Sequence, residues 1–273
     1  MKYLIAGGDS FTAEPWSWPH ILSRSNDLIC VNNGIPSAGN DYICRSLISC
    51  IQKHLEQGVA PSDIVVIPLW TFVDRKSFFI NATETRLWRD LTSEQGRRRY
   101  TVNPTSFIEH QKTLGWYGNT AKAIDSGWVV GESTIFDEHD VIGNFKKPYL
   151  IEYKTNEGSI IETLEWILFL QFFCKSHNIK LLNLAHSYES IFYYPEYNTS
   201  ENRNANTHIK ERYKKNCEHL VNLIDTSLWV TQGLLDYTIH NNLPFTSDNI
   251  HPSEEAQLHY TKNIIEPRFK NLC

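Results

Sequence analysis

Residues able to do nucleophilic chemistry stand close to both ends of this 273-residue chain. Ser10 follows Asp9 and the pair Gly7-Gly8, directly after the apolar run at residues 3–6. Two glycines let the backbone turn sharply. A serine at such a turn can project its hydroxyl from the end of a strand while its own N–H faces a developing oxyanion. The alternative interpretation is an ordinary Gly-Asp-Ser turn or helix cap.

The second motif is Asp248-Asn249-Ile250-His251-Pro252, near the other end of the chain. An aspartate three residues ahead of a histidine can fold back in a tight turn, so that its carboxylate binds one ring nitrogen. The other ring nitrogen is then free to take a proton from a serine. An ordinary turn at the start of a helix is the alternative. Together the two motifs predict Ser10 as nucleophile, His251 as general base and Asp248 as the carboxylate that orients it.

A GDSx motif after the first strand and a DxxHP motif before the last helix form the terminal signature of the SGNH, or GDSL-type, hydrolases. The chain resembles this family in the order and placement of its elements across nearly its whole length, although the motifs themselves are short. The resemblance implies a flavodoxin-like three-layer α/β/α sandwich with a central parallel sheet. It also implies that Ser10, His251 and Asp248 carry the catalytic roles.

In the family, three groups form the oxyanion hole: the nucleophile's N–H, a glycine N–H and an asparagine side chain. Ser10 carries over as the first donor, and Gly39 is our choice for the second, with Gly34 and Ser37 as alternatives. No asparagine occurs in the segment at residues 68–75 that follows the third predicted strand, where the family places its third donor. We expect the hydroxyl or N–H of Thr71 to replace it.

Four further residues near these motifs are candidates for substrate contacts: Asp9, Asn40, Trp70 and Arg75. Asn40 has a competing role as the cap of the helix that follows it. Arg75 could bind an anionic substrate, and a structural ion pair is its alternative.

Alternating strands and helices are expected to position these residues. Apolar and β-branched runs predict strands at residues 3–6, 28–31, 64–67 and 179–185, and helical periodicity predicts helices at 41–57, 159–174, 212–223 and 252–269. Such alternation indicates a parallel sheet covered by helices. It places Ser10 at the carboxyl end of a strand, where open α/β sheets build their sites.

The segment at residues 74–154 breaks this pattern, because it is polar, aromatic and poorly periodic. We expect one domain over residues 1–273, with this segment as an inserted cap of helices and loops. Trp88, Trp116 and Trp128 fall within it. They could line a substrate cleft, or they could pack the cap onto the body of the protein.

Composition narrows the classes of partner. The formal net charge is -5, and a mildly acidic chain does not indicate a nucleic-acid partner. The six cysteines form no CxxC pair, and the histidines show no HxxxH or HExxH spacing, so we expect free cysteines, no metal and no cofactor. No signal-peptide core or membrane span is evident, which favours a soluble protein, cytoplasmic or otherwise without a cleaved signal. The oligomeric state stays open.

The sequence therefore predicts a serine hydrolase that cleaves an ester bond through an acyl-enzyme on Ser10. Aromatic residues in the cap favour a small-molecule or carbohydrate ester, such as an O-acetyl group, over a long lipid chain. A sugar O-acyltransferase, in which a sugar hydroxyl replaces water, is the alternative among enzymes. A non-catalytic carbohydrate-binding or structural protein on the same fold is the second alternative, and the missing asparagine is its best support.

Overall fold

A five-stranded parallel sheet forms the centre of the protein. The computed structural model describes residues 2–36, 38–73, 75–81, 126–131, 156–188, 191 and 216–272. The strand order is β2 (Ile29–Asn32), β1 (Tyr3–Gly7), β3 (Ile64–Trp70) and β6 (Lys180–Leu181), and β7 (Leu184–Ala185) also pairs with β3. All carboxyl ends of these strands therefore point to one edge of the sheet.

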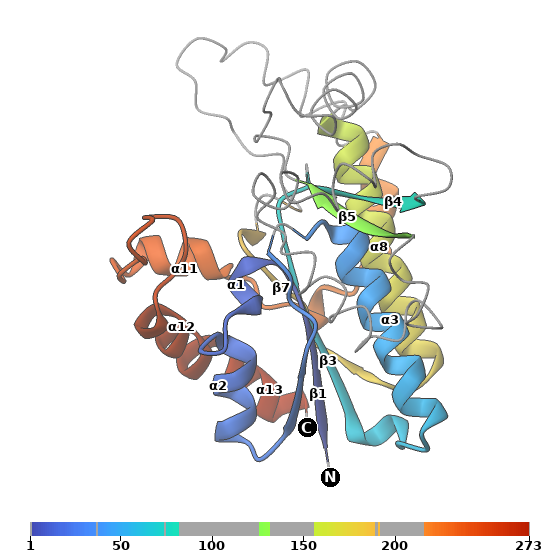
Figure 1. Ribbon diagram of the computed structural model, residues 1–273, viewed down its shortest axis with the longest axis horizontal. Helices are drawn as coiled ribbons and strands as arrows, with labels where there is room; N and C mark the ends of the chain where they lie inside the picture. Colours follow the sequence, from blue (N-terminus) through green and yellow to red (C-terminus); the bar gives the residue numbers. More distant parts are fainter. Residues whose placement is uncertain are drawn as a thin grey trace.

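Helices cover both faces of this sheet (Figure 1). On one face lie α3 (Asn40–Glu56) and α8 (Asn156–Ser176), and on the other lie α2 (Trp18–Ser25), α11 (Leu234–His240), α12 (Glu254–Tyr260) and α13 (Glu266–Leu272). The side chains of β3 alternate between the two interfaces: Val66 packs in the core beneath α3 and α8, and Val65 packs in the core beneath the other helices. The architecture is the predicted α/β/α sandwich.

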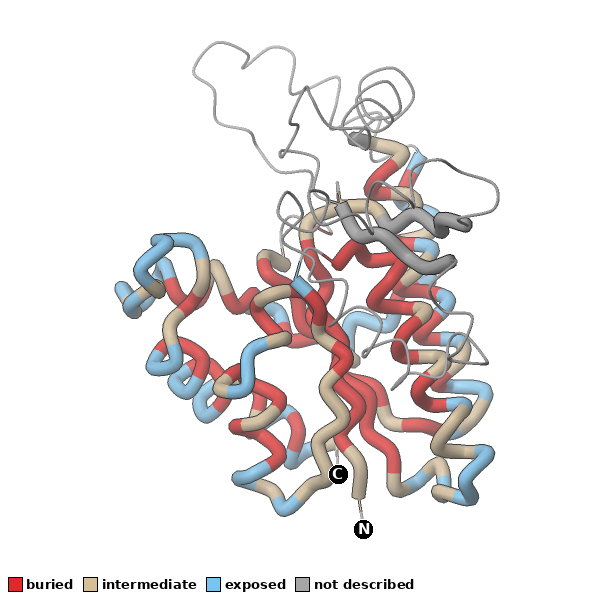
Figure 2. The backbone as a smooth tube through the Cα atoms, viewed as in Figure 1, coloured by how far each residue is buried: buried red, intermediate tan, exposed pale blue. Residues whose placement is uncertain are grey.

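Strand β3 is buried along its whole length, as Figure 2 shows for the centre of the molecule. Its β-branched run, Ile64-Val65-Val66-Ile67, suits a strand with both faces covered, and such strands occur in parallel sheets. Trp70 at its carboxyl end is fully buried, and its indole N–H donates to the Asn183 side chain at 3.0 Å. This contact ties the end of β3 to the segment between β6 and β7.

Most of the predicted elements are confirmed, with shifts at their ends. The predicted strand at 179–185 is split into β6 and β7, because Asn183 pairs with Trp229 instead. The predicted helix at 212–223 is helical from residue 216 to 221 in its described part. The last helix continues from α12 through a π-helical turn, Thr261–Ile265, into α13.

The described part of the expected cap is a β-ribbon, which corrects the prediction of helices and loops there. Strand β4 (Lys76–Asn81) leaves the carboxyl end of β3 and pairs antiparallel with β5 (Ser126–Gly131). The aromatic and β-branched residues of these two segments favour strands, a local signal that the polar surroundings obscured. Trp128 lies in β5 opposite Phe79. Trp88 and Trp116 lie outside the described residues, so a tryptophan facing the site stays a prediction.

All five described cysteines are free, as predicted: Cys30, Cys44, Cys50, Cys174 and Cys217. Burial raises the pKa of Cys174 to about 12, and burial with the nearby Glu157 raises the pKa of Cys217 to about 11. Such thiols stay protonated near neutral pH and are poor nucleophiles. No described helix is long and apolar enough to cross a membrane.

Candidate active site

Ser10 is the first residue of the short helix α1 (Ser10–Ala13), which begins just beyond the carboxyl end of β1. Asp9 binds the three amides that follow Ser10: its carboxylate accepts from Phe11 N–H, and its carbonyl accepts from the N–H groups of Thr12 and Ala13. The Ser10 N–H has no hydrogen-bond partner among the described residues. It is therefore the amide of this turn that remains available to a ligand.

Gly8 lets the chain pass close to α1 just before Ser10. A Cβ atom added at this position would lie 2.1 Å from the Thr12 hydroxyl oxygen. No side chain fits at that separation, so the chain can only approach α1 this closely with glycine here.

Ser10, His251 and Asp248 form a hydrogen-bonded series. The Ser10 hydroxyl oxygen lies 2.8 Å from His251 Nε2, and His251 Nδ1 lies 2.5 Å from Asp248 Oδ2. A serine on one ring nitrogen and a carboxylate on the other is the arrangement that lets a histidine act as general base. The structure thus brings together the three residues that the terminal motifs predict, across 241 positions of sequence.

The tight turn expected from the Asp248–His251 spacing is present. Asp248 Oδ1 accepts hydrogen bonds from the Thr246 hydroxyl, the Ile250 N–H and the His251 N–H. Asn249 adopts a positive φ of 58°, a conformation that asparagine tolerates better than most residues. The bond from Thr246, the two amides and His251 hold the pKa of Asp248 well below its usual range. The Asp248 carboxylate that faces His251 is therefore ionised near neutral pH.

A buried glutamine couples the two ends of the chain at this site. Gln257 on α12 donates to the Phe11 carbonyl at 2.9 Å and accepts from the Trp18 N–H at 3.2 Å. These bonds hold α1, which carries Ser10, against the helix that follows His251. The sequence contained no signal for this role, because a glutamine in an amphipathic helix usually faces solvent.

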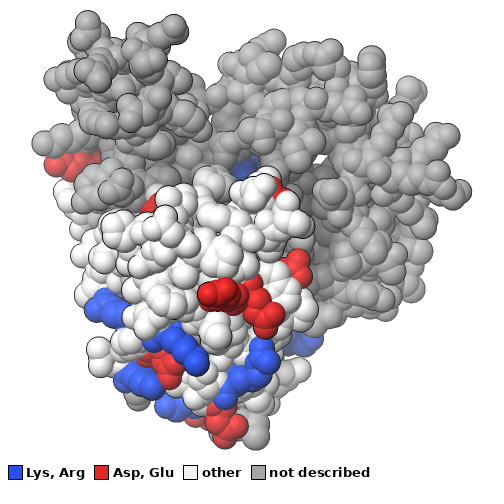
Figure 3. All heavy atoms as spheres, turned by 90° about the vertical axis from the view of Figure 1, so that its left-hand side faces the viewer, with Lys and Arg blue, Asp and Glu red and all other residues white. Residues whose placement is uncertain are grey.

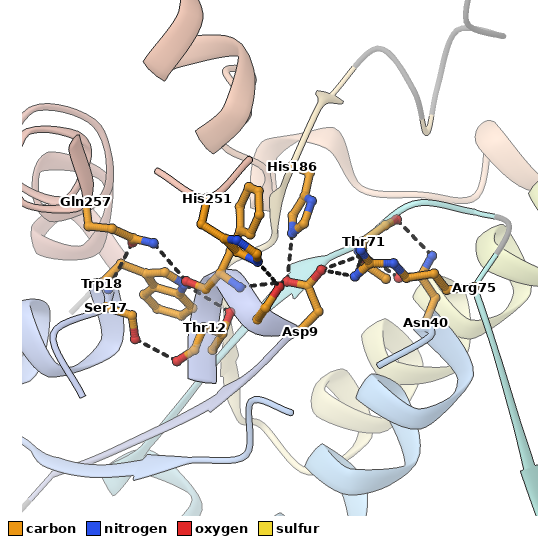
Figure 4. A network of polar contacts seen from close by, with 12 residues as sticks. Asp9, Thr12, Ser17, Trp18, Asn40, Thr71, Arg75, His186, His251 and Gln257 are labelled. Carbon is orange, nitrogen blue, oxygen red and sulfur yellow. Dashed lines mark hydrogen bonds and ion pairs between the residues drawn. The ribbon is translucent and has the colours of Figure 1, made fainter. Parts of the chain in front are cut away.

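Asp9, the residue before Ser10, lies in a buried polar network (Figure 4). Its side chain is fully buried and has four donors: Phe11 N–H and His186 Nε2 on Oδ1, and the Thr71 hydroxyl and Arg75 guanidinium on Oδ2. Burial alone would raise the pKa of Asp9, but His186, Arg75 and the Phe11 N–H outweigh it and hold the pKa well below its usual range. The expectation that Asp9 contacts substrate is thus wrong, since no part of its side chain is accessible.

Thr71 is not placed as the predicted oxyanion donor. Its hydroxyl accepts from Arg75 at 3.0 Å and therefore gives its own proton to Asp9, at 2.9 Å, while its N–H donates to the Asn40 side chain at 2.9 Å. Both donors are satisfied inside the protein, and Thr71 is 1% exposed. The prediction rested only on the position of Thr71 after the third strand. In the structure, the Thr71 hydroxyl donates to the neighbouring Asp9 carboxylate instead. The third donor remains unassigned.

Asn40 and Trp70, both expected to contact substrate, are buried parts of the scaffold. The Asn40 side chain binds both backbone groups of Thr71 and also donates to the Thr163 hydroxyl on α8. It caps no helix, because Gly39 is the N-cap of α3. Trp70 binds Asn183 as described above. Asn40 thereby fixes the start of α3 against the end of β3.

Gly39 lies at a close approach of two segments, and its role as the second oxyanion donor stays a prediction. A Cβ atom at Gly39 would lie 2.8 Å from both the Arg75 carbonyl oxygen and Asp41 Oδ1, so the chain passes too closely here for another residue. Gly34 is less suitable, because its N–H already donates to the Asn32 side chain at 2.9 Å. Ser37 lies outside the described residues.

Arg75 forms a structural ion pair, the alternative to binding an anionic substrate. Its guanidinium forms an ion pair with Asp9, bonds the Thr71 hydroxyl and lies 5.3 Å from the centre of the Phe72 ring. Its side chain is 11% exposed. The buried carboxylate, and not an anionic substrate, is what neutralises this charge.

His186 is the second member of the site that sequence reasoning missed. It follows β7, is 1% exposed, and places Nε2 2.8 Å from Asp9 Oδ1. Its spacing from other histidines or acids in the sequence gave no signal, because its partner lies 177 positions away. Only the parallel pairing of β7 with β3, and of β3 with β1, brings it to the same edge of the sheet.

On the face shown in Figure 3, Lys and Arg side chains are interspersed with Asp and Glu, without a patch of one sign. Within the described ranges, no group of three or more His, Cys, Asp or Glu side chains could hold a metal ion.

Comparison with known proteins leaves the family unassigned. No family model matches the chain, and no curated protein matches it. A member of the lipolytic G-D-S-L family from Veillonella parvula DSM 2008 has a similar structure at 8% identity and a TM-score of 0.38, with 96% of each chain covered. A G-D-S-L family protein from Desulfitobacterium hafniense DCB-2 is similar at 13% identity and a TM-score of 0.29, over all of both chains. At these scores, the strand order and the site geometry have to carry any functional argument.

Proposed function

We propose that the protein is a serine hydrolase of the SGNH type that cleaves an ester bond through an acyl-enzyme on Ser10. The observation that carries the proposal is the series Ser10–His251–Asp248, with separations of 2.8 and 2.5 Å. A binding protein has no need of a serine aligned on a histidine that is itself aligned on an ionised carboxylate. This geometry therefore favours catalysis over the non-catalytic alternative.

In the proposed reaction, His251 Nε2 removes the Ser10 hydroxyl proton while the serine oxygen attacks the ester carbonyl carbon. The N–H of Ser10, together with that of Gly39, stabilises the tetrahedral oxyanion. His251 then gives its proton to the leaving alcohol, and the acyl group stays on Ser10. A water molecule, deprotonated by His251, releases the acid and restores the serine. Asp248 stabilises the imidazolium in both halves of the reaction.

The substrate class stays part of the proposal. The aromatic residues of the 74–154 segment favour a short acyl group on a carbohydrate or other small molecule. Two of these residues, Trp88 and Trp116, lie outside the described residues. An acyltransferase would use the same acyl-enzyme and differ only in the acceptor that attacks it. Adding sugar alcohols to the assay and measuring acylated product separates the two reactions.

Labelling with a fluorophosphonate probe tests the proposal directly, because only an activated serine reacts with it. We expect the wild type to be labelled and to hydrolyse short-chain aryl esters, and Ser10→Ala to do neither. Ser227→Ala is the matched control, since Ser227 is an exposed serine hydrogen-bonded to Asp225. A folded wild type that resists labelling and cleaves none of the esters would support the non-catalytic alternative.

A further inference from the structure

We infer that His186 is a positioning residue for both the nucleophile and the base, acting through Asp9 and Phe11. This inference rests on the proposed function of Ser10 and His251. It assigns to the active site a second, buried histidine–carboxylate pair that the triad does not include.

The first route runs through Asp9. Asp9 precedes Ser10 and, with its carboxylate and carbonyl, binds the amides of Phe11, Thr12 and Ala13. His186 shares carboxylate oxygen Oδ1 with the Phe11 N–H, at 2.8 and 3.0 Å respectively. The imidazole therefore sets the direction from which this oxygen can cap α1. Because α1 begins at Ser10, a rotated Asp9 carboxylate would turn the Ser10 N–H and hydroxyl away from their working directions.

The second route runs through the ring of Phe11. His186 stacks on this ring with centroids 3.9 Å apart and planes 15° apart, and His251 meets the same ring edge-on at 5.4 Å and 62°. The two histidines thus both contact one aromatic side chain, which lies in the helix that carries Ser10. A change in the His186 ring is passed to the residue that His251 packs against.

His186 is held in place by few groups, which makes it sensitive to substitution. Asp9 is ionised, so His186 Nε2 carries the proton in their hydrogen bond. The other ring nitrogen, Nδ1, is buried and has no hydrogen-bond partner among the described residues. The ring therefore depends on Asp9 at one end and on contacts with Phe11 and with Phe72, whose ring centroid lies 5.1 Å away.

Two substitutions separate the hydrogen bond from the ring. His186→Phe keeps a flat ring against Phe11 and deletes the donor to Asp9, whereas His186→Gln keeps an N–H donor and loses the ring. We expect His186→Phe to lower kcat and the rate constant of fluorophosphonate labelling by about ten- to a hundred-fold, the scale of a small misplacement of reacting groups. We expect His186→Gln to recover part of that loss and KM to change by less than about threefold. His240→Phe, at an exposed histidine on α11, is the control and should change neither.

The labelling data distinguish positioning from loss of folded protein. A structural role would lower the number of serines that become labelled, whereas positioning lowers the rate constant of those that do. A His186→Phe rate constant within about twofold of wild type, or a loss explained wholly by fewer labelled sites, would overturn the inference. If His186→Phe does not fold, His186→Asn replaces it, because the shorter asparagine side chain should not reach Asp9. We then expect the serine of His186→Asn to be labelled more slowly than that of His186→Gln. Equal labelling rate constants for these two variants would again overturn the inference. An inert wild type overturns the proposed function as well, while an active wild type with unaffected variants overturns only the role of His186.

Discussion

Two histidine–carboxylate pairs flank the same short helix, and they differ in exposure. In the pair Asp248–His251 the side chains are 45% and 33% exposed, while in the pair Asp9–His186 they are fully buried and 1% exposed. Only the exposed pair has a serine hydroxyl on its second ring nitrogen. Under the proposed function, one pair moves protons and the other holds the backbone that presents the serine.

The pairs also differ in what neutralises the carboxylate. Asp248 is satisfied by a hydroxyl, two amides and its histidine, and it faces water. Asp9 has no access to water, so its charge requires the Arg75 guanidinium. Losing a partner is therefore expected to affect catalysis alone at the first pair, and both stability and the placement of Ser10 at the second. The predictions that follow test this division, from the largest expected effect to the smallest.

The largest effect is expected from His251→Gln, which keeps a polar side chain but removes the base. We expect kcat for an aryl ester to fall by about four to six orders of magnitude, as when a member of such a triad is deleted. The midpoint of urea unfolding should stay close to that of wild type, because His251 is partly exposed. His259→Gln, at an exposed histidine on α12, is the control. Residual activity within tenfold of wild type would remove His251 from the base role.

Asp9→Asn should lower the stability of the folded protein in addition to the reaction rate of Ser10. The substitution leaves the Arg75 charge, which is 11% exposed, without its carboxylate and turns one acceptor oxygen into a donor group. Breaking a buried ion pair by removing one partner costs about 3–5 kcal/mol. We therefore expect the free energy of unfolding, measured by urea titration, to fall by about that amount. Asp248→Asn, at the exposed pair, should keep its unfolding midpoint and lose activity; the reverse result would contradict the division between the pairs.

The buried Asp9 carboxylate should also make the stability of the protein depend on acid pH. The pKa of Asp9 is lower in the folded protein than the ordinary value of about 3.9 for an unfolded chain. The folded state then binds fewer protons between these two values, so the stabilisation is complete above about pH 4 and is lost as the pH falls toward the folded pKa. We expect the unfolding free energy of wild type to fall more steeply below pH 4 than that of Asp9→Asn. Parallel curves would show that Asp9 is not the linked group.

The sequence predicted the elements that depend on local pattern and those parts of the site that lie close together in the chain. The buried run Ile64-Val65-Val66-Ile67 identified the central strand, and the spacing of Asp248 and His251 identified their turn. The match of the two terminal motifs placed Ser10 beside them. These features follow from periodicity and from turns that span a few residues.

The sequence could not predict the inner part of the site. Whether Asp9 faces substrate or the interior depends on Thr71, Arg75 and His186, which come from three distant segments and meet only when the strands pair. The Gly-Asp-Ser sequence is the same whether its aspartate faces substrate or the interior. Thr71 was assigned by its position after the third strand, but a buried carboxylate beside a hydroxyl decides where that hydroxyl points.

Thr71→Val carries the smallest expected effect and sharpens the comparison most. The substitution keeps the β-branched shape and removes the hydroxyl that donates to Asp9 and accepts from Arg75. If Thr71 were an oxyanion donor, kcat would fall by about one to three orders of magnitude. In the observed geometry, Asp9 loses one of four donors, so we expect the unfolding free energy to fall by about 1–3 kcal/mol and kcat to change by less than about fivefold. Thr71→Ser is the matched control: it keeps the hydroxyl, so it should restore most of the stability lost in Thr71→Val. A large fall in kcat with an unchanged unfolding midpoint would show that Thr71 is an oxyanion donor after all. Its hydroxyl would then have to turn toward substrate during the reaction.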